Sequence, residues 1–303
     1  MRLPRLAWFT LGWNVAVILW GAFVRASGSG AGCGAHWPLC NGEVVPRAPA
    51  LATLIEYTHR VTSGMALLLV FYVAYRVFRE RPSGPPARRA AAASVLFLLT
   101  EAGVGAGLVL FRLVAENESV ARALFMSVHL VNTFVLLACL TLCAHFCGLA
   151  SPSRLVARRA WPFAAAAAAL LVVGTSGAVA ALGDTLYPAR SLGAGLAADF
   201  SETAHFLVRL RLAHPLLALA GAAAVAIAVV QALRSGDAAS RRAALALLLL
   251  VAVQLVAGLA NVVLLAPVWL QIVHLLLADL AWITLVLLAA RALARPAAAT
   301  SGS

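Results

Sequence analysis

The chain has 303 residues, of which 63% are hydrophobic and only 11% are charged, and its mean hydropathy is +0.95. Soluble domains are about half apolar and about a quarter charged, so this composition excludes an ordinary soluble protein and indicates an integral membrane protein. The formal net charge of +12 does not indicate a nucleic-acid partner, because no basic face is interleaved with aromatic side chains as a nucleic-acid groove requires.

A helix needs about 20 apolar residues to cross the hydrocarbon core of a bilayer. The first apolar run is followed by Arg25 and a long polar segment without a convincing small-residue cleavage site, so we interpret it as a helix and not as a signal peptide. The sequence predicts an all-α integral membrane protein with eight transmembrane helices, near residues 6–25, 56–78, 91–111, 120–147, 160–182, 204–233, 242–265 and 268–291.

Every basic residue among the 23 is an arginine, and most of them lie in alternate loops between the predicted helices. The positive-inside rule places such loops in the cytoplasm. We therefore expect a multi-pass protein of the cell membrane with both termini cytoplasmic. The arginines that support this orientation are Arg2, Arg5, Arg76, Arg79, Arg81, Arg88, Arg89, Arg154, Arg158, Arg159, Arg234, Arg241, Arg242, Arg291 and Arg295.

This orientation places the segment 26–55 outside the cytoplasm. The segment is too long and too rich in glycine and proline for a tight connection, and loops of this length are usually functional or disordered. It contains Cys33 and Cys40, in a location where a disulfide persists. We expect them to form a disulfide, which is either a structural link or a redox-active pair. With only His36 nearby, they fall short of the four ligands that a structural zinc site takes.

Four histidines lie in the outer halves of the even-numbered predicted helices. Glu56 precedes His59 by three residues, so the two share a helix face. His129, His214 and His274 occupy the other three helices at equivalent depth. A single intramembrane histidine can be a core residue bonded to a carbonyl, but four at one depth favour a function. Two neutral imidazoles that face each other suit axial ligation of haem iron, so the count favours two bis-histidine sites.

Other charged residues near these helices are open to two interpretations. Arg25, Arg60, Arg209 and Arg211 lie near outer helix ends, where they either receive haem propionates or extend to the membrane surface. Glu101 and Asp279 have no assigned role; a protonated carboxyl group bonded to a neighbouring helix is the default, and proton delivery is the alternative. We interpret Cys139, Cys143 and Cys147 as small packing residues on one face of their helix.

The positions of these residues indicate an internal repeat. His59 and His129 in the first half correspond to His214 and His274 in the second. The pattern Glu101-x-x-x-Gly105 likewise corresponds to Gln254-x-x-x-Gly258. We therefore predict two tandem four-helix bundles, residues 1–150 and 151–303, related by a pseudo-twofold axis along the membrane normal.

Taken together, these motifs resemble the haem A synthase family over nearly the whole chain. The matching residues are Gly28-Ser29-Gly30, Cys33-x6-Cys40 around Trp37-Pro38-Leu39, Glu56-Tyr57-x-His59-Arg60, His129, His214 and His274. The resemblance implies a haem b between His214 and His274, and the substrate haem O between His59 and His129. It also implies two hydroxylations of the C8 methyl group, which yield the formyl group of haem A for terminal oxidases.

In this family the carboxylate that matches Glu56 is essential, and its role is either proton handling or positioning of the oxidised intermediate. The implied partners are haem O synthase, membrane lipid and an electron acceptor that the sequence does not identify. The chain departs from the family at His36, where members often have aspartate. It also lacks a cysteine pair in the second outer loop, so any redox relay depends on Cys33 and Cys40 alone.

Three other functions compete with this interpretation. A bis-histidine dihaem cytochrome that only passes electrons explains the histidines, but not Glu56 beside His59 or the cysteine segment. A transporter built from repeats predicts broken helices and paired midplane charges, of which only Glu101 and Asp279 give any sign. A prenyltransferase that acts on haem needs aspartate-rich magnesium-diphosphate motifs, which this sequence does not contain.

Overall fold

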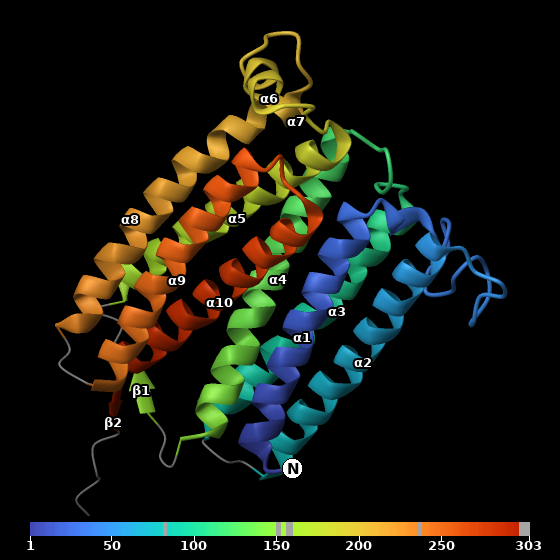
Figure 1. Cartoon of the computed structure of the whole chain (residues 1–303). Helices are drawn as coiled ribbons and strands as arrows, with labels where there is room; N and C mark the ends of the chain where they lie inside the picture. The colour runs from blue at the N-terminus through green and yellow to red at the C-terminus, as the bar shows by residue number, and fades with distance from the viewer. Residues whose placement is uncertain (81–83, 150–152, 156–159, 235–237, 297–303) are drawn as a thin grey trace, which may run out of the picture.

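The computed structural model describes residues 1–80, 84–149, 153–155, 160–234 and 238–296, and most of them are helical (Figure 1). Within these ranges, eight helical segments are long and apolar enough to cross a membrane, which confirms the predicted all-α membrane protein. They are α1 (Leu3–Ala26), α2 (Leu51–Glu80), α3 (Pro85–Leu110), α4 (Val120–Cys147), α5 (Trp161–Leu186), the stretch Phe206–Leu233, α9 (Ala238–Val263) and α10 (Val268–Leu293). The predicted boundary between the two four-helix bundles, at residues 150 and 151, lies outside the described residues. So do three of the arginines used to predict the orientation, Arg81, Arg158 and Arg159.

Helix α2 begins earlier than the sequence pattern suggested, at Leu51 and not near Glu56. Pro46 and Pro49 keep the preceding segment out of a helix because proline lacks the N–H donor, whereas the apolar residues 51–55 continue the helix towards the outer end. Glu56 and His59 therefore lie well inside α2 and not at its first turn, on backbone that the helix holds rigidly.

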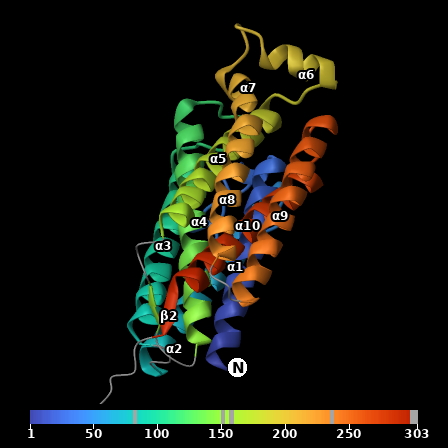
Figure 2. The ribbon, with the colours of Figure 1, turned by 90° about the vertical axis from the view of Figure 1, so that its left-hand side faces the viewer.

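The sixth predicted span consists of three pieces: α7 (Phe206–Arg209), a 3-10 turn η3 (Leu210–Leu212) and α8 (Ala213–Leu233). The break precedes Pro215, which has no N–H to donate to the carbonyl group one turn earlier. The preceding outer segment, expected as a loop, contains α6 (Leu192–Asp199), whose first turn is capped by Ser191. Figure 2 shows α6 beyond the end of the bundle.

Helices α1–α4 lie on one side of the molecule, and α5, α8, α9 and α10 lie on the other (Figure 1). The most extensive contacts within these groups join α3 with α4, α9 with α10, α5 with α8 and α1 with α2. Across the groups, α4 packs against α5 and α10. There the Trp282 ring stacks on Phe134 at 5.1 Å between ring centres, and its Nε1 donates to the Phe134 carbonyl at 2.6 Å. The pseudo-twofold relation between the groups remains a prediction.

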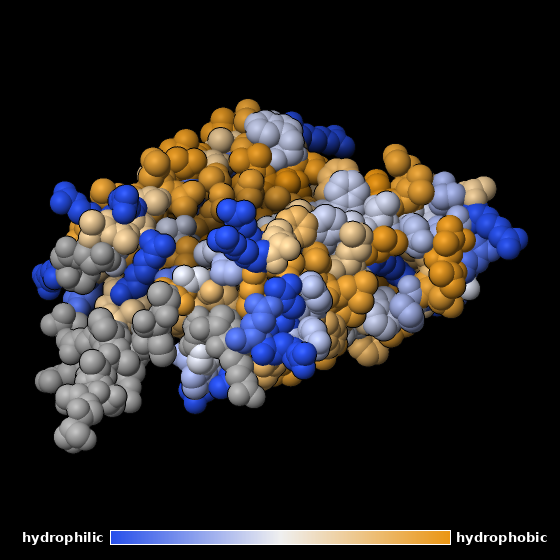
Figure 3. Space-filling view, turned by 90° about the horizontal axis from the view of Figure 1, so that it is seen from below, coloured by the Kyte–Doolittle hydropathy of each residue, from blue (hydrophilic) through white to orange (hydrophobic). Residues whose placement is uncertain are grey.

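The surface of the bundle fits contact with lipid. Large apolar side chains project outward along the spans, for example Leu68, Leu216 and Val256, each about two-thirds exposed or more. Hydrophilic side chains gather at the end that carries the N-terminus (Figure 3). At this end β1 (Ser153–Leu155) pairs antiparallel with β2 (Ala294–Pro296). The chain is thus a multi-pass membrane protein.

Candidate functional site

Each of the four predicted histidines packs against a glycine of a neighbouring helix. A Cβ atom added to any of these glycines would lie within 4 Å of the imidazole, and in three cases it would be closer than the roughly 3.5 Å at which carbon atoms normally touch. The glycines therefore leave the space that the rings occupy. The distances from the added Cβ to the ring Cε1 are 2.9 Å for Gly21 and His59, 3.8 Å for Gly105 and His129, 2.9 Å for Gly177 and His214, and 3.1 Å for Gly258 and His274.

The second histidine pair is close enough to share one metal ion. The ring centres of His214 and His274 are 6.3 Å apart and the ring planes are inclined at 82°. Two imidazoles that bind one metal through bonds of about 2 Å have centres about 6 Å apart. Ser176 Oγ lies 3.0 Å from His214 Nδ1, and Gln254 Nε2 lies 3.2 Å from His274 Nε2. The structure therefore brings this predicted pair together in an arrangement that fits haem iron.

The first pair has a different surrounding. His59 and His129 are close enough for their charged forms to interact. Glu101 Oε1 lies 3.6 Å from His129 Nδ1, and neither His59 Nδ1 nor His129 Nδ1 has a hydrogen-bond partner among the described residues. Sequence reasoning left Glu101 without a role. The signal that pointed to it was its place one turn before Gly105, which contacts the same histidine ring.

Glu56 joins α2 to the outer segment that contains the disulfide. The predicted bond between Cys33 and Cys40 is present. The Cys33 N–H donates to Glu56 Oε2 at 2.9 Å, and Arg60 NH2 pairs with Glu56 Oε1 at 2.5 Å. Glu56 is only 3% exposed, so its carboxylate is buried with both oxygens occupied. His59, one turn later, packs on Gly21 of α1.

The four arginines predicted to receive haem propionates fall into two groups. Arg60 and Arg211 already pair with carboxylates, since Arg211 contacts Asp184 at 2.9 Å and Asp199 at 2.7 Å. Arg25 instead donates to neutral groups, and Arg209 is exposed; among the described residues neither forms an ion pair. Arg25 and Arg209 are therefore the two of the four arginines without a carboxylate partner among the described residues.

The contacts of Arg25 connect the two helix groups near the outer end. Its guanidinium donates to the Ala181 carbonyl at 2.8 Å, to Thr185 Oγ1 at 2.7 Å and to Gln271 Oε1 at 2.9 Å. Sequence reasoning missed a second buried arginine, Arg122, which is 3% exposed. It donates to the carbonyls of Ala115 and Asn117 at 2.5 and 2.7 Å and has no ion pair among the described residues. The sequence feature that could have indicated Arg122 is its position as an arginine in the first turn of the apolar helix α4.

Tyr187 closes the outer end of α5. Its hydroxyl donates to the carboxylate of Glu118, and this hydrogen bond raises the pKa of Tyr187 to about 12. The contact joins the segment after α5 to the segment before α4, and it keeps the outer ends of the two helix groups together.

The cysteines of α4 agree with the prediction that they are packing residues, whereas Asp279 lacks the hydrogen bond that was expected for it. Cys143 and Cys147 are buried in the core at the N-terminal end of the molecule, as packing residues. Asp279 is fully buried, but the hydrogen bond expected from a neighbouring helix is absent within the described ranges. It lies three residues before Trp282, in the part of α10 that packs against α4, where apolar side chains predominate.

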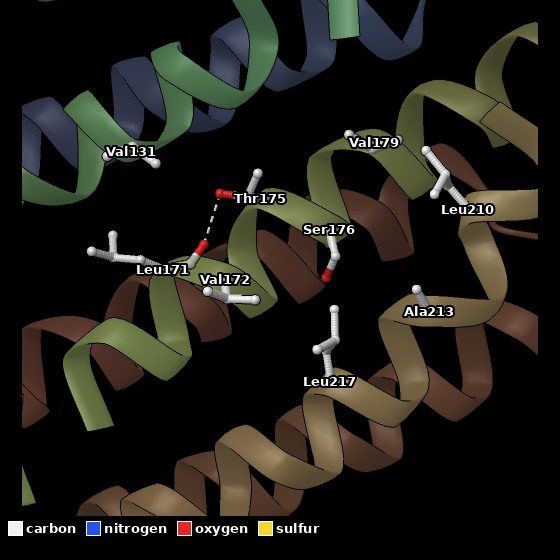
Figure 4. A pocket seen from close by; sticks show the side chains of 9 residues that line it. All are labelled: Val131, Leu171, Val172, Thr175, Ser176, Val179, Leu210, Ala213 and Leu217. Carbon is white, nitrogen blue, oxygen red and sulfur yellow. Dashed lines mark hydrogen bonds between the residues drawn. The ribbon is translucent and has the colours of Figure 1, made fainter. Parts of the chain in front are cut away.

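A cavity of about 400 Å³ lies beside the second histidine pair, between α4, α5 and α8 (Figure 4). Its walls are apolar apart from Ser176 and Thr175, and Ser176 also contacts His214. Apolar walls with a few polar groups are typical of small-molecule sites.

Comparison with known proteins agrees with this geometry. The family model described as cytochrome oxidase assembly protein, COX15-CtaA, matches residues 4–286. A "Protoheme IX farnesyltransferase" of Thermus thermophilus is 50% identical over 300 residues, which are 98% of this chain but 49% of that protein. The chain thus spans about half the length of that relative.

Shorter matches carry a different name. A "Heme A synthase" of Alkalihalophilus pseudofirmus is 41% identical over 95 residues, which are 31% of this chain and 32% of that protein. The "Heme A synthase" of Halalkalibacterium halodurans is 42% identical over 97 residues, 32% and 33% of the two chains. Because the family model covers nearly the whole chain, the protein belongs to the COX15-CtaA family of cytochrome oxidase assembly proteins, the haem A synthase family.

Proposed function

We propose that the protein is a haem A synthase that oxidises the C8 methyl group of haem O to a formyl group by two successive hydroxylations. In this proposal His59 and His129 bind the substrate haem O, and His214 and His274 are the axial ligands of a resident haem b. The observation that carries the proposal is that each of the four histidine rings packs on a glycine of an adjacent helix, and that the rings of His214 and His274 lie 6.3 Å apart.

The resident haem b supplies one-electron chemistry when it is bound. The protein's own residues hold, orient and shield the reacting groups. Gly21 and Gly105 leave the space in which the imidazoles of the substrate site are placed. Glu56, buried beside the disulfide segment, holds or moves a proton near the substrate, because a carboxylate in a low-dielectric site can act as a general base or acid. Arg25 and Arg209 receive propionates.

The Thermus thermophilus relative is about twice as long as this chain, and this difference suggests that a separate protein supplies the substrate. The named farnesyltransferase activity of that protein would belong to the half that this chain does not match. A separate haem O synthase would then supply the farnesylated substrate to this chain, and an electron acceptor would remove the electrons. The protein would act in the cell membrane with both termini in the cytoplasm, since the arginine-rich loops lie at one end of the bundle.

Two other functions remain as alternatives. A dihaem cytochrome is favoured by the glycine that packs on each of the four histidine rings. A farnesyltransferase is favoured by the name of the 50% identical relative. The cytochrome alternative does not account for the buried Glu56, which joins the disulfide segment to the helix of His59.

Expression in membranes separates these functions. The chain is produced in a host that makes neither haem O nor haem A, with and without a separate haem O synthase, and the haems are extracted and separated by chromatography. Haem A only in the presence of both proteins supports the proposal. Haem O formed by this chain alone would indicate farnesyl transfer. Absence of haem A from both cultures, with haem O only where the separate synthase is present, would indicate a cytochrome.

Variants of the second pair test the assignment of the two sites. His214→Ala or His274→Ala should remove the low-spin haem b spectrum, whereas His59→Ala should leave it in place and abolish haem A formation. An unchanged haem b spectrum in His274→Ala would reject the assignment.

A further inference from the structure

Glu101 and Gln254 occupy equivalent positions in the two helix groups. Each lies one turn before the glycine that packs on a histidine ring, Gly105 on His129 and Gly258 on His274. The two side chains face different nitrogens of these rings: Glu101 Oε1 is 3.6 Å from His129 Nδ1, whereas Gln254 Nε2 is 3.2 Å from His274 Nε2. The same helix face therefore carries a carboxyl group at the first pair and a neutral amide at the second.

The carboxyl group of Glu101 is held by side chains of α4. Asn132 Nδ2 donates to Glu101 Oε2 at 2.5 Å, and the Thr133 hydroxyl lies within hydrogen-bonding distance of Oε1. The Asn132 amide is itself fixed, because it also donates to the Phe97 carbonyl at 2.8 Å and accepts from Thr100 at 2.6 Å. This arrangement places the Asn132 amide at Oε2, and the Thr133 hydroxyl and the His129 ring at Oε1.

The amide of Gln254 is held less firmly. Its Oε1 has no hydrogen-bond partner in the described part of the chain, and its Nε2 contacts only the His274 ring in the bonds that the structure shows. An amide also carries no charge, so it cannot change the electron density of a ligand ring as a carboxylate does.

We propose that Glu101 is a positioning residue for His129: its carboxylate, 3.6 Å from Nδ1, would accept from that N–H when a haem is bound, hold the orientation of the ring, and make the iron of the first site more electron-rich. A carboxylate that accepts from the free N–H of a metal-bound histidine fixes the tautomer and raises the basicity of the ligand. This inference rests on the proposed function, since it requires a haem between His59 and His129.

The consequence is a difference in reduction potential between the two haem sites. A more basic ligand stabilises ferric iron, so Glu101 lowers the potential of the first site. Glu101→Gln should therefore raise that potential and leave the second unchanged. Gln254→Glu is not a mirror of this change, because residue 254 faces Nε2 of His274 and not Nδ1; it should leave the first-site potential unchanged. Glu101→Asp, which keeps the carboxylate, should retain most of the wild-type value.

The experiment is a spectroscopic redox titration of the full chain, purified in detergent from a host that makes haem b and haem O. The component that belongs to each site is identified as the one that His59→Ala or His274→Ala removes. A rise of the first-site potential in Glu101→Gln, with Glu101→Asp close to the wild-type value and the second-site potential unchanged, supports the proposal. Identical potentials in wild type and Glu101→Gln, at full haem content, overturn it while the two-site proposal stands.

Two further outcomes are informative. Wild-type protein that binds haem only at His214 and His274 would reject the substrate site and this inference together. If Glu101→Gln does not accumulate, Asn132→Leu and Thr133→Val remove the residues that hold the carboxylate in place. A smaller rise of the first-site potential in these variants supports the proposal, and no change overturns it.

Discussion

At the scale of single residues, the buried Glu56 has two tasks that a substitution can separate. Its Oε2 accepts from the Cys33 N–H, and its Oε1 pairs with Arg60. Glutamine keeps an oxygen for the Cys33 N–H but has no charge for Arg60, whereas alanine leaves both partners unpaired. A buried group that loses its partner costs about 1–3 kcal/mol, and more if it is charged.

We expect Glu56→Gln to retain both haems and the disulfide segment, and to lower the rate of haem A formation by about 100-fold or more, the usual contribution of an acid–base group. Chromatography of extracted haems measures the rate, and the reduced haem spectrum measures occupancy. A normal rate in Glu56→Gln would show that the carboxylate has only a structural role. Glu56→Ala should in addition loosen the segment around Cys33.

At the scale of helices, the contact between glycine and imidazole decides where each ring lies. A methyl group at Gly21 would lie 2.9 Å from His59 Cε1, and one at Gly177 would lie 2.9 Å from His214 Cε1. Crowding of this kind in a packed interior typically costs about 1–3 kcal/mol and displaces side chains. The two positions belong to different histidine pairs, so their effects should be separable.

Gly21→Ala should reduce haem binding at the first site and spare the second, and Gly177→Ala should do the reverse. Haem content and the low-spin spectrum report both effects. The matched control is Gly12→Ala in α1, where an added Cβ meets nothing within 4 Å; it should bind haem normally and gain up to about 1 kcal/mol in stability. Equal haem loss in Gly12→Ala and Gly21→Ala would contradict the role of the contact.

At the scale of the whole molecule, the disulfide segment that follows α1 lies at the end of the bundle opposite to the N-terminus (Figure 1). Described arginines at the other end include Arg79 in the last turn of α2 and Arg88 in the first turn of α3. This separation makes the orientation testable with exposed positions at the two ends, Glu202 after α6 and Arg242 in the first turns of α9. Of the native thiols, Cys143 and Cys147 are buried and Cys139 is partly buried within the membrane-spanning α4, so we expect none of them to react with a reagent confined to water.

A membrane-impermeant maleimide should label Glu202→Cys in intact cells and Arg242→Cys only after permeabilisation, because positive loops remain in the cytoplasm. The unmodified chain serves as the control and should stay unlabelled in intact cells. The reverse pattern would invert the orientation and place the disulfide segment in the cytoplasm.

The sequence predicted the spans well, because the transfer of about 20 apolar residues into a bilayer depends only on local composition. The sequence was a less accurate guide to the points at which a helix begins or breaks. Helix α2 begins at Leu51, before Glu56, because the apolar residues after Pro49 continue the helix. The short helical segments before Pro215 could not be predicted, because they depend on the backbone hydrogen bonds of the folded chain.

The site was predicted unevenly for a similar reason. Four histidines at one depth can be recognised from spacing alone, and so can the cysteine pair. Glu101 could not be assigned, because its partners Asn132 and His129 lie on another helix. The sequence also could not show which of the four arginines already have a carboxylate partner. In the structure Arg60 pairs with Glu56, and Arg211 pairs with Asp184 and Asp199.

The sequence by itself determined the membrane class, the number of spans, the histidine set and the disulfide. These follow from hydropathy, charge and spacing, which act along the chain. Only the tertiary structure decided that each imidazole packs on a glycine of a neighbouring helix, and that a carboxyl group faces one pair where an amide faces the other. Such contacts join residues far apart in the chain, and they arise only when helices pack at close range.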